Sequence, residues 1–124
     1  CVGETKQQRE DGKTEEVIHT QIVQGLEGLD VDSPDRLVIA YEPVWAIGTG
    51  LNATGEDANA VIGFIRDTLA ELFGSTTAEA VRILYGGSVK AENIKEFMSQ
   101  PQIDGALVGG ASLDASSFAQ IVKY

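Results

Sequence analysis

The amino-acid sequence predicts an α/β protein in which four strand–helix units build one parallel sheet. Short apolar runs are continuous rather than alternating, which is typical of strands buried on both faces. Each run leads through a polar or glycine-rich turn into a helix, and this alternation indicates parallel strands with right-handed crossovers. Such units form either an open doubly wound sheet or a closed barrel, and in both the ligand binds beyond the carboxyl ends of the strands.

The first half of the chain is expected to contain the stub of a strand at 1–4, a helix from 14 to about 28 and a strand at 37–41. Thr14 is expected to cap the helix, because Glu15 and Glu16 follow in its first turn. The buried side of this helix is predicted from apolar residues spaced four and three apart: Ile18, Ile22, Leu26 and Leu29. Turn residues at 31–35 separate the helix from the strand LVIAY.

The second half is expected to open with a long helix that begins after Thr54 and ends at Gly74. Thr54 and Asp57 form a variant capping box, with Asp in place of the usual Glu or Gln. One helical stripe holds the apolar residues Ala58, Val61, Ile62, Ile65, Leu69 and Leu72. Strands are then expected at 81–85 and 105–108, with helices at 93–99 and 116–122.

Composition excludes several classes of function. The chain has 124 residues, with 19 acidic against 9 basic side chains and a formal net charge of -10, so neither a nucleic acid nor an anionic membrane is an expected partner. The single cysteine, Cys1, is expected to be a small buried side chain without a nucleophilic role. His19 is expected to be a solvated or half-buried helix residue, and no metal or cofactor is predicted. Because no leader and no apolar run of ~18 residues is recognised, a cytoplasmic location is expected.

Glu42 is the sharpest candidate for chemistry. It follows the strand at 37–41 and precedes Pro43, Val44 and Trp45. Apolar surface closing over a carboxylate desolvates it and raises its basicity, which suits a general base. The alternative is a glutamate at a strand end that simply faces water.

Residues 43–53 are predicted to form a hinged lid. The segment starts rigidly at Pro43, has a small-residue centre at Gly48, Thr49 and Gly50, and exceeds the roughly 2 to 6 residues usual for such a connection. Long loops of this kind often carry function. An ordinary connecting loop remains the alternative.

Two glycine-rich turns, Gly86-Gly87-Ser88 and Gly109-Gly110, each follow a predicted strand. Backbone N–H groups in such turns can point at one anion. In barrel enzymes this corner commonly binds phosphate. Each turn taken alone is also compatible with a tight connection that binds nothing.

Taken together, the segments CVGE, AYEPVWAIGTG, ILYGGSV and DGALVGGASL resemble the carboxyl-terminal half of triosephosphate isomerases, over essentially the whole chain. The resemblance implies that residues 1–124 are one half-barrel, βα units five to eight of a TIM (β/α)8 barrel. It also implies that Glu42 is the base that shuttles a proton, through an enediolate, between dihydroxyacetone phosphate and glyceraldehyde 3-phosphate. The implied setting is glycolysis and gluconeogenesis.

The resemblance assigns further roles. Residues 43–53 would be a phosphate-gripping lid that includes Pro43, Val44, Trp45, Thr49 and Gly50. The substrate phosphate would accept hydrogen bonds from the backbone of Gly48, Ser88, Gly109 and Gly110. Hydrogen bonds that change as the lid opens and closes would involve Tyr41, Trp45, Glu4 and Tyr85. Leu51-Asn52 at the second hinge departs from the polar residue that family members often carry first.

The same resemblance implies missing parts. The family's amino-terminal half supplies a lysine, a neutral histidine and the loop that builds a homodimer, and no residue of this chain matches them. We therefore expect this chain alone to be nearly inactive, to need an amino-terminal half-barrel and to be part of a homo-oligomer. The alternatives are a non-catalytic half-barrel that self-associates, and a phosphate-binding barrel from tryptophan or histidine synthesis. The second does not explain the glutamate, proline and tryptophan before a small-residue lid.

Overall fold

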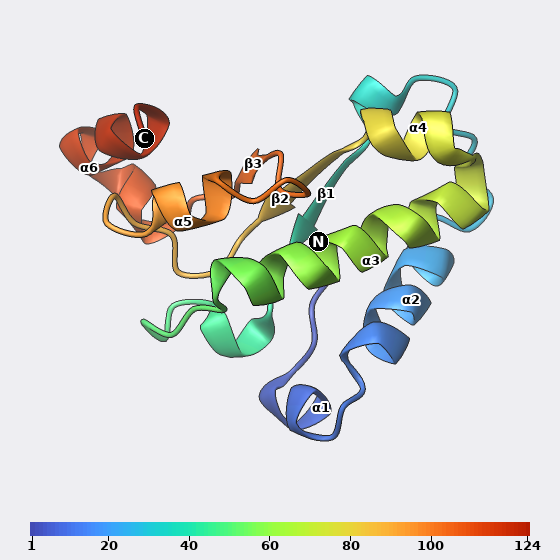
Figure 1. The fold of residues 1–124 in the computed structure, drawn as a ribbon, viewed down its shortest axis with the longest axis horizontal. Helices are drawn as coiled ribbons and strands as arrows, with labels where there is room; N and C mark the ends of the chain where they lie inside the picture. The colour runs from blue at the N-terminus through green and yellow to red at the C-terminus, as the bar shows by residue number, and fades with distance from the viewer.

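A three-stranded parallel sheet forms the centre of the molecule in the computed structural model, which describes residues 1–124 (Figure 1). Its strands are β1 (Val38–Tyr41), β2 (Arg82–Tyr85) and β3 (Gly105–Ala106), in that order across the sheet. Val2 adds an isolated parallel bridge to Tyr41, at the place where a strand stub is expected. The predicted α/β class and parallel sheet are therefore confirmed.

The register of the strands brings their carboxyl ends to one edge. Tyr41 pairs with Tyr85, the last residue of the neighbouring strand, and Tyr85 pairs with Ala106. The loops that follow all three strands therefore leave the sheet on the same side. This is the edge at which the sequence predicts the site.

Six helices connect and cover the strands. They are α1 (Lys6–Glu10), α2 (Thr14–Gly25), α3 (Gly55–Phe73), α4 (Ser75–Ala80), α5 (Ile94–Met98) and α6 (Ala115–Val122). Short 3-10 turns lie at Pro34–Arg36, Val44–Ala46 and Gly110–Leu113. In Figure 1 the long helix α3 crosses beside β1 and β2 with α2 next to it, and α2, β1 and β2 all contact α3.

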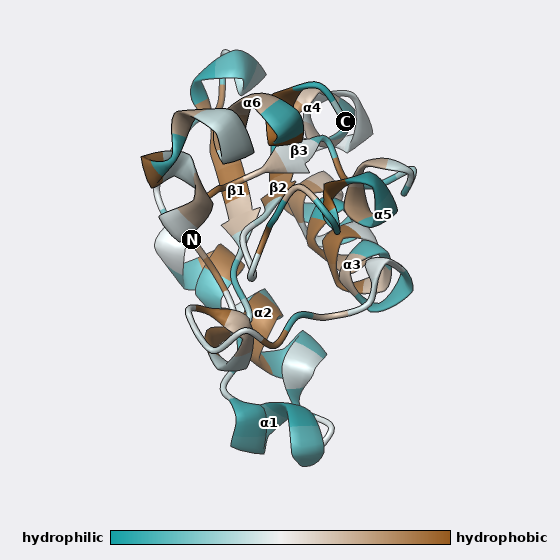
Figure 2. Ribbon diagram, turned by 90° about the vertical axis from the view of Figure 1, so that its left-hand side faces the viewer, coloured by the Kyte–Doolittle hydropathy of each residue, from teal (hydrophilic) through white to brown (hydrophobic).

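The core lies between α2, α3 and the strands. Ile62, Ile65 and Leu69 of α3 are fully buried, and they belong to one apolar cluster with Ile18 of α2 and Ile83 of β2. Burial of each such side chain contributes about 1.5–3 kcal/mol. Figure 2 shows this division, with apolar colour on β1 and β2 and a hydrophilic α1. The predicted apolar faces of both helices are confirmed except at one residue each, Leu29 and Leu72.

Several local expectations are wrong in detail. Leu29 and Leu72 are exposed, because they lie at or beyond the ends of their helices, where the core no longer covers them. Thr14 does not cap α2; Lys13 precedes the helix and no side chain caps it. Cys1 is exposed rather than buried.

The ends of α3 follow the sequence closely. The Thr54 hydroxyl accepts a hydrogen bond from the backbone N–H of Asp57 at 3.1 Å, but the reciprocal bond of a full capping box is not formed. Gly74 ends the helix with φ of 86°, in the region that only glycine adopts without strain. The helix α4 starts at the next residue and was not predicted.

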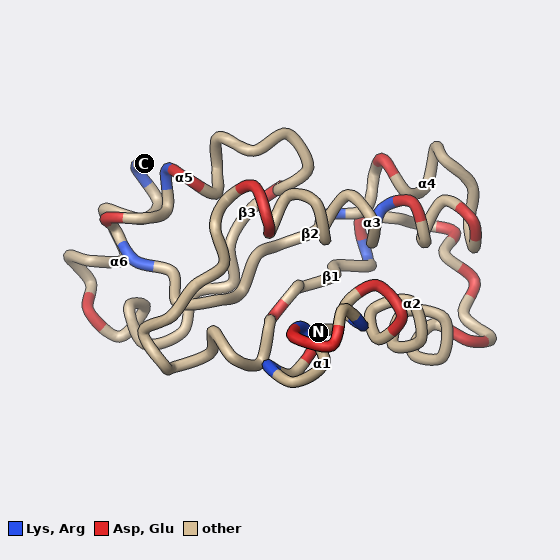
Figure 3. Tube along the Cα trace, turned by 60° about the horizontal axis from the view of Figure 1, so that its bottom comes forward, with Lys and Arg blue, Asp and Glu red and all other residues tan.

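Charge is distributed unevenly over the fold. Figure 3 shows acidic positions spread along most of the trace, while basic positions are fewer and separated. No helix combines the length with the apolar character that crossing a bilayer requires.

Candidate functional site

Glu42 lies where β1 ends, at the carboxyl edge of the sheet. Its backbone N–H donates to the Val2 carbonyl at 2.7 Å, and the N–H of Gly86 donates to the Tyr41 carbonyl at 2.9 Å. The position of Glu42 is therefore fixed by backbone on both sides. Its side chain is half-buried.

Two glycines make room for Glu42. A Cβ at Gly86 would lie 2.5 Å from the Glu42 Cγ and 3.1 Å from its Cδ. A Cβ at Gly3 would overlap the Glu42 carbonyl oxygen. The sequence pattern indicated Gly86 as part of an anion-binding turn, but it gave no signal that Gly86 and Gly3 pack against the glutamate.

One pocket of about 710 Å³ brings the predicted residues together beyond the strand ends. This volume suits a small ligand. Its lining comes from the end of β1, from the segment 43–53 and from both glycine turns: Glu42, Ile47, Gly48, Gly50, Gly86, Gly87, Ser88, Gly109 and Gly110. Glu42 thus shares a cavity with the backbone groups that the sequence suggests for an anion.

The loop backbone around this pocket retains free hydrogen-bond donors. None of the backbone–backbone hydrogen bonds in the turns and loops uses the N–H of Gly48, Ser88, Gly109 or Gly110. These four groups can therefore donate to a ligand. Lys90 is the one basic side chain in the lining, so an anion would depend mainly on backbone donors.

The segment 43–53 has anchored ends and an exposed middle. Pro43, Ala46 and Ala53 are buried, whereas residues 47–52 are exposed. Gly48 and Gly50 have φ of 65° and 77°. The middle is held mainly from within, because the Thr49 hydroxyl donates to the Trp45 carbonyl at 2.8 Å. This arrangement fits the lid prediction, although movement itself stays a prediction.

A side-chain hydrogen bond connects this segment to the first glycine-rich turn, Gly86-Gly87-Ser88. The Ser88 hydroxyl donates to the Ala46 carbonyl at 2.7 Å. The Ser88 carbonyl in turn accepts from the Asn93 amide at 2.7 Å. The turn at 86–88 is therefore positioned against the segment 43–53 by the Ser88 side chain, and the backbone N–H of Ser88 stays available.

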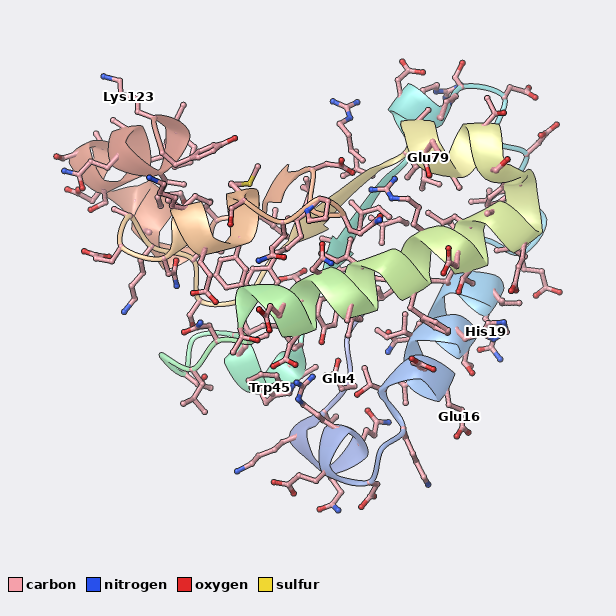
Figure 4. The ribbon with its side chains drawn as sticks, viewed as in Figure 1. Glu4, Glu16, His19, Trp45, Glu79 and Lys123 are labelled. Carbon is pink, nitrogen blue, oxygen red and sulfur yellow. The ribbon has the colours of Figure 1, made fainter.

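Glu4 is fully buried and accepts hydrogen bonds from several donors. The Tyr41 hydroxyl lies 3.1 Å from each carboxylate oxygen, and the Trp45 indole N–H donates to Oε1 at 3.2 Å. Figure 4 shows Glu4 and Trp45 close together between α1 and the first turns of α3. The first end of the segment 43–53 is therefore held by a buried carboxylate.

Tyr85 holds the other end. Its hydroxyl oxygen accepts the backbone N–H of Ala53 at 3.1 Å. Burial raises the pKa of Tyr85, and burial together with the adjacent Glu4 carboxylate raises the pKa of Tyr41. Both phenols therefore stay protonated at neutral pH.

Two observations bear on residues outside the pocket. His19 is exposed on α2, and in Figure 4 it lies well apart from Trp45. No group of three or more His, Cys, Asp or Glu side chains has a geometry that could hold a metal ion.

Arg9 is a residue that the sequence analysis missed. It contacts Glu4, Trp45 and Asp57, which lie far apart in the sequence. Only the folded structure brings them together.

Comparison with known proteins gives a match over the full chain. The family model described as triosephosphate isomerase matches residues 1–124. A triosephosphate isomerase of Moorella thermoacetica is 64% identical over 124 residues, which cover 100% of this chain and 49% of that protein. A triosephosphate isomerase of Caldanaerobacter subterraneus subsp. tengcongensis is 60% identical, covering 100% and 50%. That of Dictyoglomus thermophilum is 58% identical over 123 residues, covering 99% and 49%. The chain thus spans about half the length of the curated relatives it matches.

Proposed function

Because the chain belongs to the triosephosphate isomerase family, we propose that it supplies the base, the lid and the phosphate site of an isomerase that acts on triose phosphates. In this proposal residues 1–124 are βα units five to eight of the barrel, the carboxyl-terminal half. Family membership argues against the alternative of a barrel from tryptophan or histidine synthesis. The observation that carries the proposal is the single pocket shared by Glu42 and the two glycine turns.

Glu42 is the proposed proton shuttle. Its carboxylate removes a proton from one carbon of the triose phosphate and returns a proton to the neighbouring carbon, so the aldose and the ketose interconvert through an enediolate. The reaction consumes no proton overall. The half-buried position of Glu42 suits this role, because its carboxylate shares the pocket with Ile47 and Gly86 and can therefore reach a ligand bound there.

The phosphate group is proposed to lie against the backbone of Gly48, Ser88, Gly109 and Gly110. With a formal net charge of -10, the chain repels a dianion at long range, so short-range N–H donors must supply the attraction. The lid over residues 43–53 closes on the same phosphate. Closure excludes water, which would otherwise protonate the enediolate or allow phosphate to be eliminated.

Activity is proposed for the complete barrel rather than for this chain alone. The groups that polarise the substrate carbonyl would come from an amino-terminal half-barrel, and the assembled enzyme would be a homo-oligomer. Loss of one preorganised donor to a developing oxyanion costs on the order of 10² to 10³ in rate. The isolated chain is therefore expected to be nearly inactive.

The test is an assay of glyceraldehyde 3-phosphate isomerisation with the chain alone and after addition of a matching amino-terminal half-barrel. Activity is expected only in the mixture, and Glu42→Gln should abolish it. Glu79→Gln is the matched control, because Glu79 is exposed on α4, away from the pocket (Figure 4). A mixture that folds but stays inactive, or that keeps full activity with Glu42→Gln, contradicts the proposal.

A second candidate is a non-catalytic half-barrel that self-associates. It is favoured by large apolar side chains that are exposed at and around α6, with Leu113 91% and Val122 62% exposed. Light scattering distinguishes the two candidates, because a single chain has a mass of 13.2 kDa. A stable homo-oligomer that does not dissociate when the amino-terminal half is added would favour this second candidate.

A further inference from the structure

Arg9, on α1, contacts three side chains that have different functions in the fold. Its Nη1 lies 3.4 Å from Oε1 of Glu4, and its Nη2 lies 3.3 Å from Oδ2 of Asp57. Its guanidinium carbon lies 5.0 Å from the centre of the Trp45 ring. This distance is within the range of a cation–π contact.

The contact with Glu4 compensates a buried charge. Glu4 has no exposed surface, and the other side chains that donate to it, Tyr41 and Trp45, are neutral. Arg9 is the one cation within ion-pair distance of Glu4. A buried carboxylate without a compensating cation is strongly destabilising, so Arg9 helps to keep Glu4 in place as an acceptor.

Trp45 is consequently held on two sides. The edge of its indole donates to Glu4 at 3.2 Å, while Arg9 covers its face. The same guanidinium therefore fixes the ring directly and also fixes the carboxylate to which the ring is bonded. A lysine in place of Arg9 could pair with Glu4, but it lacks the planar fork that reaches three partners.

Asp57 orients the guanidinium from the other end of the lid. It lies in the first turn of α3, which begins at Gly55, immediately after the lid segment. Arg9 thus connects α1, the first hinge at Trp45 and the helix that follows the second hinge.

From this geometry we propose that Arg9 is a positioning residue, which holds the first hinge of the lid by covering Trp45 and by keeping Glu4 available as its acceptor. The placement of Trp45 is a statement about the fold alone. The kinetic consequence rests on the proposed function, because it assumes that the lid closes over a triose phosphate.

The expected kinetic effect is a change in KM more than in kcat. Without Arg9 the first hinge adopts additional conformations, and only one of them allows the ligand to bind. The apparent affinity for the ligand falls in proportion to the population of that binding-competent conformation. For the loss of one cation–π contact this is roughly a 3- to 10-fold rise in KM, with kcat changed by less than about 2-fold. A merely structural defect would instead lower kcat through loss of folded enzyme and leave KM unchanged.

Trp45 provides a direct readout, because it is the single tryptophan of the chain. In Arg9→Met its emission should move to longer wavelength, and the rate of acrylamide quenching should rise roughly 3-fold, while the circular dichroism stays that of the native chain. Arg9→Lys should restore native stability but not the native quenching rate. Arg36→Met is the matched control, because Arg36 is exposed and forms no ion pair. Asp57→Asn should shift the quenching in the same direction as Arg9→Met by a smaller amount.

Fluorescence is measured on the chain, and kinetics on the chain completed with a tryptophan-free half-barrel partner. Native emission and quenching in Arg9→Met, or full rescue of quenching by Arg9→Lys, would overturn the proposal. If Arg9→Met does not fold, the Asp57→Asn variant provides the test. An unchanged rate of acrylamide quenching of Trp45 in Asp57→Asn also overturns the proposal. A changed Trp45 signal together with no isomerisation by the unsubstituted assembly would leave this inference standing and refute the proposed function.

Discussion

Replacing Gly86 with alanine tests whether the position of the Glu42 side chain against Gly86 is required for the chemistry. The new methyl group would lie 2.5 Å from the Glu42 Cγ and 3.1 Å from its Cδ, whereas carbon atoms pack at about 3.5–4.0 Å. Gly86 does not have a positive φ, so alanine strains no backbone angle there. The overlap of about 1 Å must be relieved by moving the Glu42 side chain.

The effect on stability should be small and the effect on rate large. Because Glu42 is half-buried and faces the pocket, its side chain can move into open space, and the free energy of unfolding should fall by about 1 kcal/mol, the low end for overpacking. A displacement of about 1 Å at a reacting group can cost about 10²-fold in rate. We therefore expect Gly86→Ala in the completed barrel to lose about 10²-fold in kcat.

The assay combines urea unfolding with isomerase kinetics. Gly63→Ala is the matched control: Gly63 lies in α3, and a Cβ there would be 3.6 Å from the Gln102 Cγ, an ordinary contact. That control should be stabilised by roughly 0.5–1 kcal/mol, since glycine is unfavourable inside a helix. If Gly86→Ala keeps kcat within about 3-fold of the unsubstituted enzyme, the placement of Glu42 against Gly86 is not required for the chemistry, and the reasoning fails.

Two further predictions concern buried polar groups. Tyr41→Phe removes the hydroxyl that donates to Glu4 and should lower the free energy of unfolding by about 1–3 kcal/mol in urea titrations. Since folding raises the pKa of Tyr41 above its ordinary value of 10.0, the unfolded chain ionises first, and stability should decline as pH rises above that value; Tyr41→Phe should show a smaller decline. Arg66→Met removes the ion pair between the buried Arg66 and the exposed Asp104 (2.8 Å) and leaves the buried carbonyls of Ala78 and Val81 without their donor. Because the unpaired carbonyls carry most of the cost, we expect the free energy of unfolding to fall by about 2–4 kcal/mol, and a loss below about 1 kcal/mol would contradict this.

The parts of the fold that the sequence predicted are those with strong local signals. The helix α3 has a long apolar stripe, a threonine cap at Thr54 and a glycine stop at Gly74. The helix α1 spans only five residues, which are too few to show a helical period of apolar residues. Thr5 and Gln8 nevertheless form a capping box, which could have indicated the start of this helix. The strand β3 ends at Ala106, two residues before the expected end, although the Leu107 N–H still donates to the Tyr85 carbonyl at 2.9 Å.

The candidate site was predictable for a topological reason. Parallel strands bring their carboxyl ends together, so Glu42 and the two glycine turns had to meet once the strands were recognised. No comparable topological rule predicts the contacts of Arg9. They depend on where the fold places α1 relative to Trp45 and to the start of α3, and a single arginine among polar residues carries no sequence signal for that.

Glu4 and Glu42 have different surroundings because Tyr41 and Glu42, which are consecutive residues at the end of a strand, face opposite sides. Tyr41 turns inward to Glu4, whose carboxylate is taken up entirely by donors of the protein, whereas Glu42 faces the pocket. The two are also joined by backbone: the Glu42 N–H donates to Val2 at 2.7 Å, and the Val44 N–H donates to Glu4 at 3.0 Å. Residues 2–4 therefore hold Glu42, the proposed base, and the first hinge of the proposed lid in one short ladder.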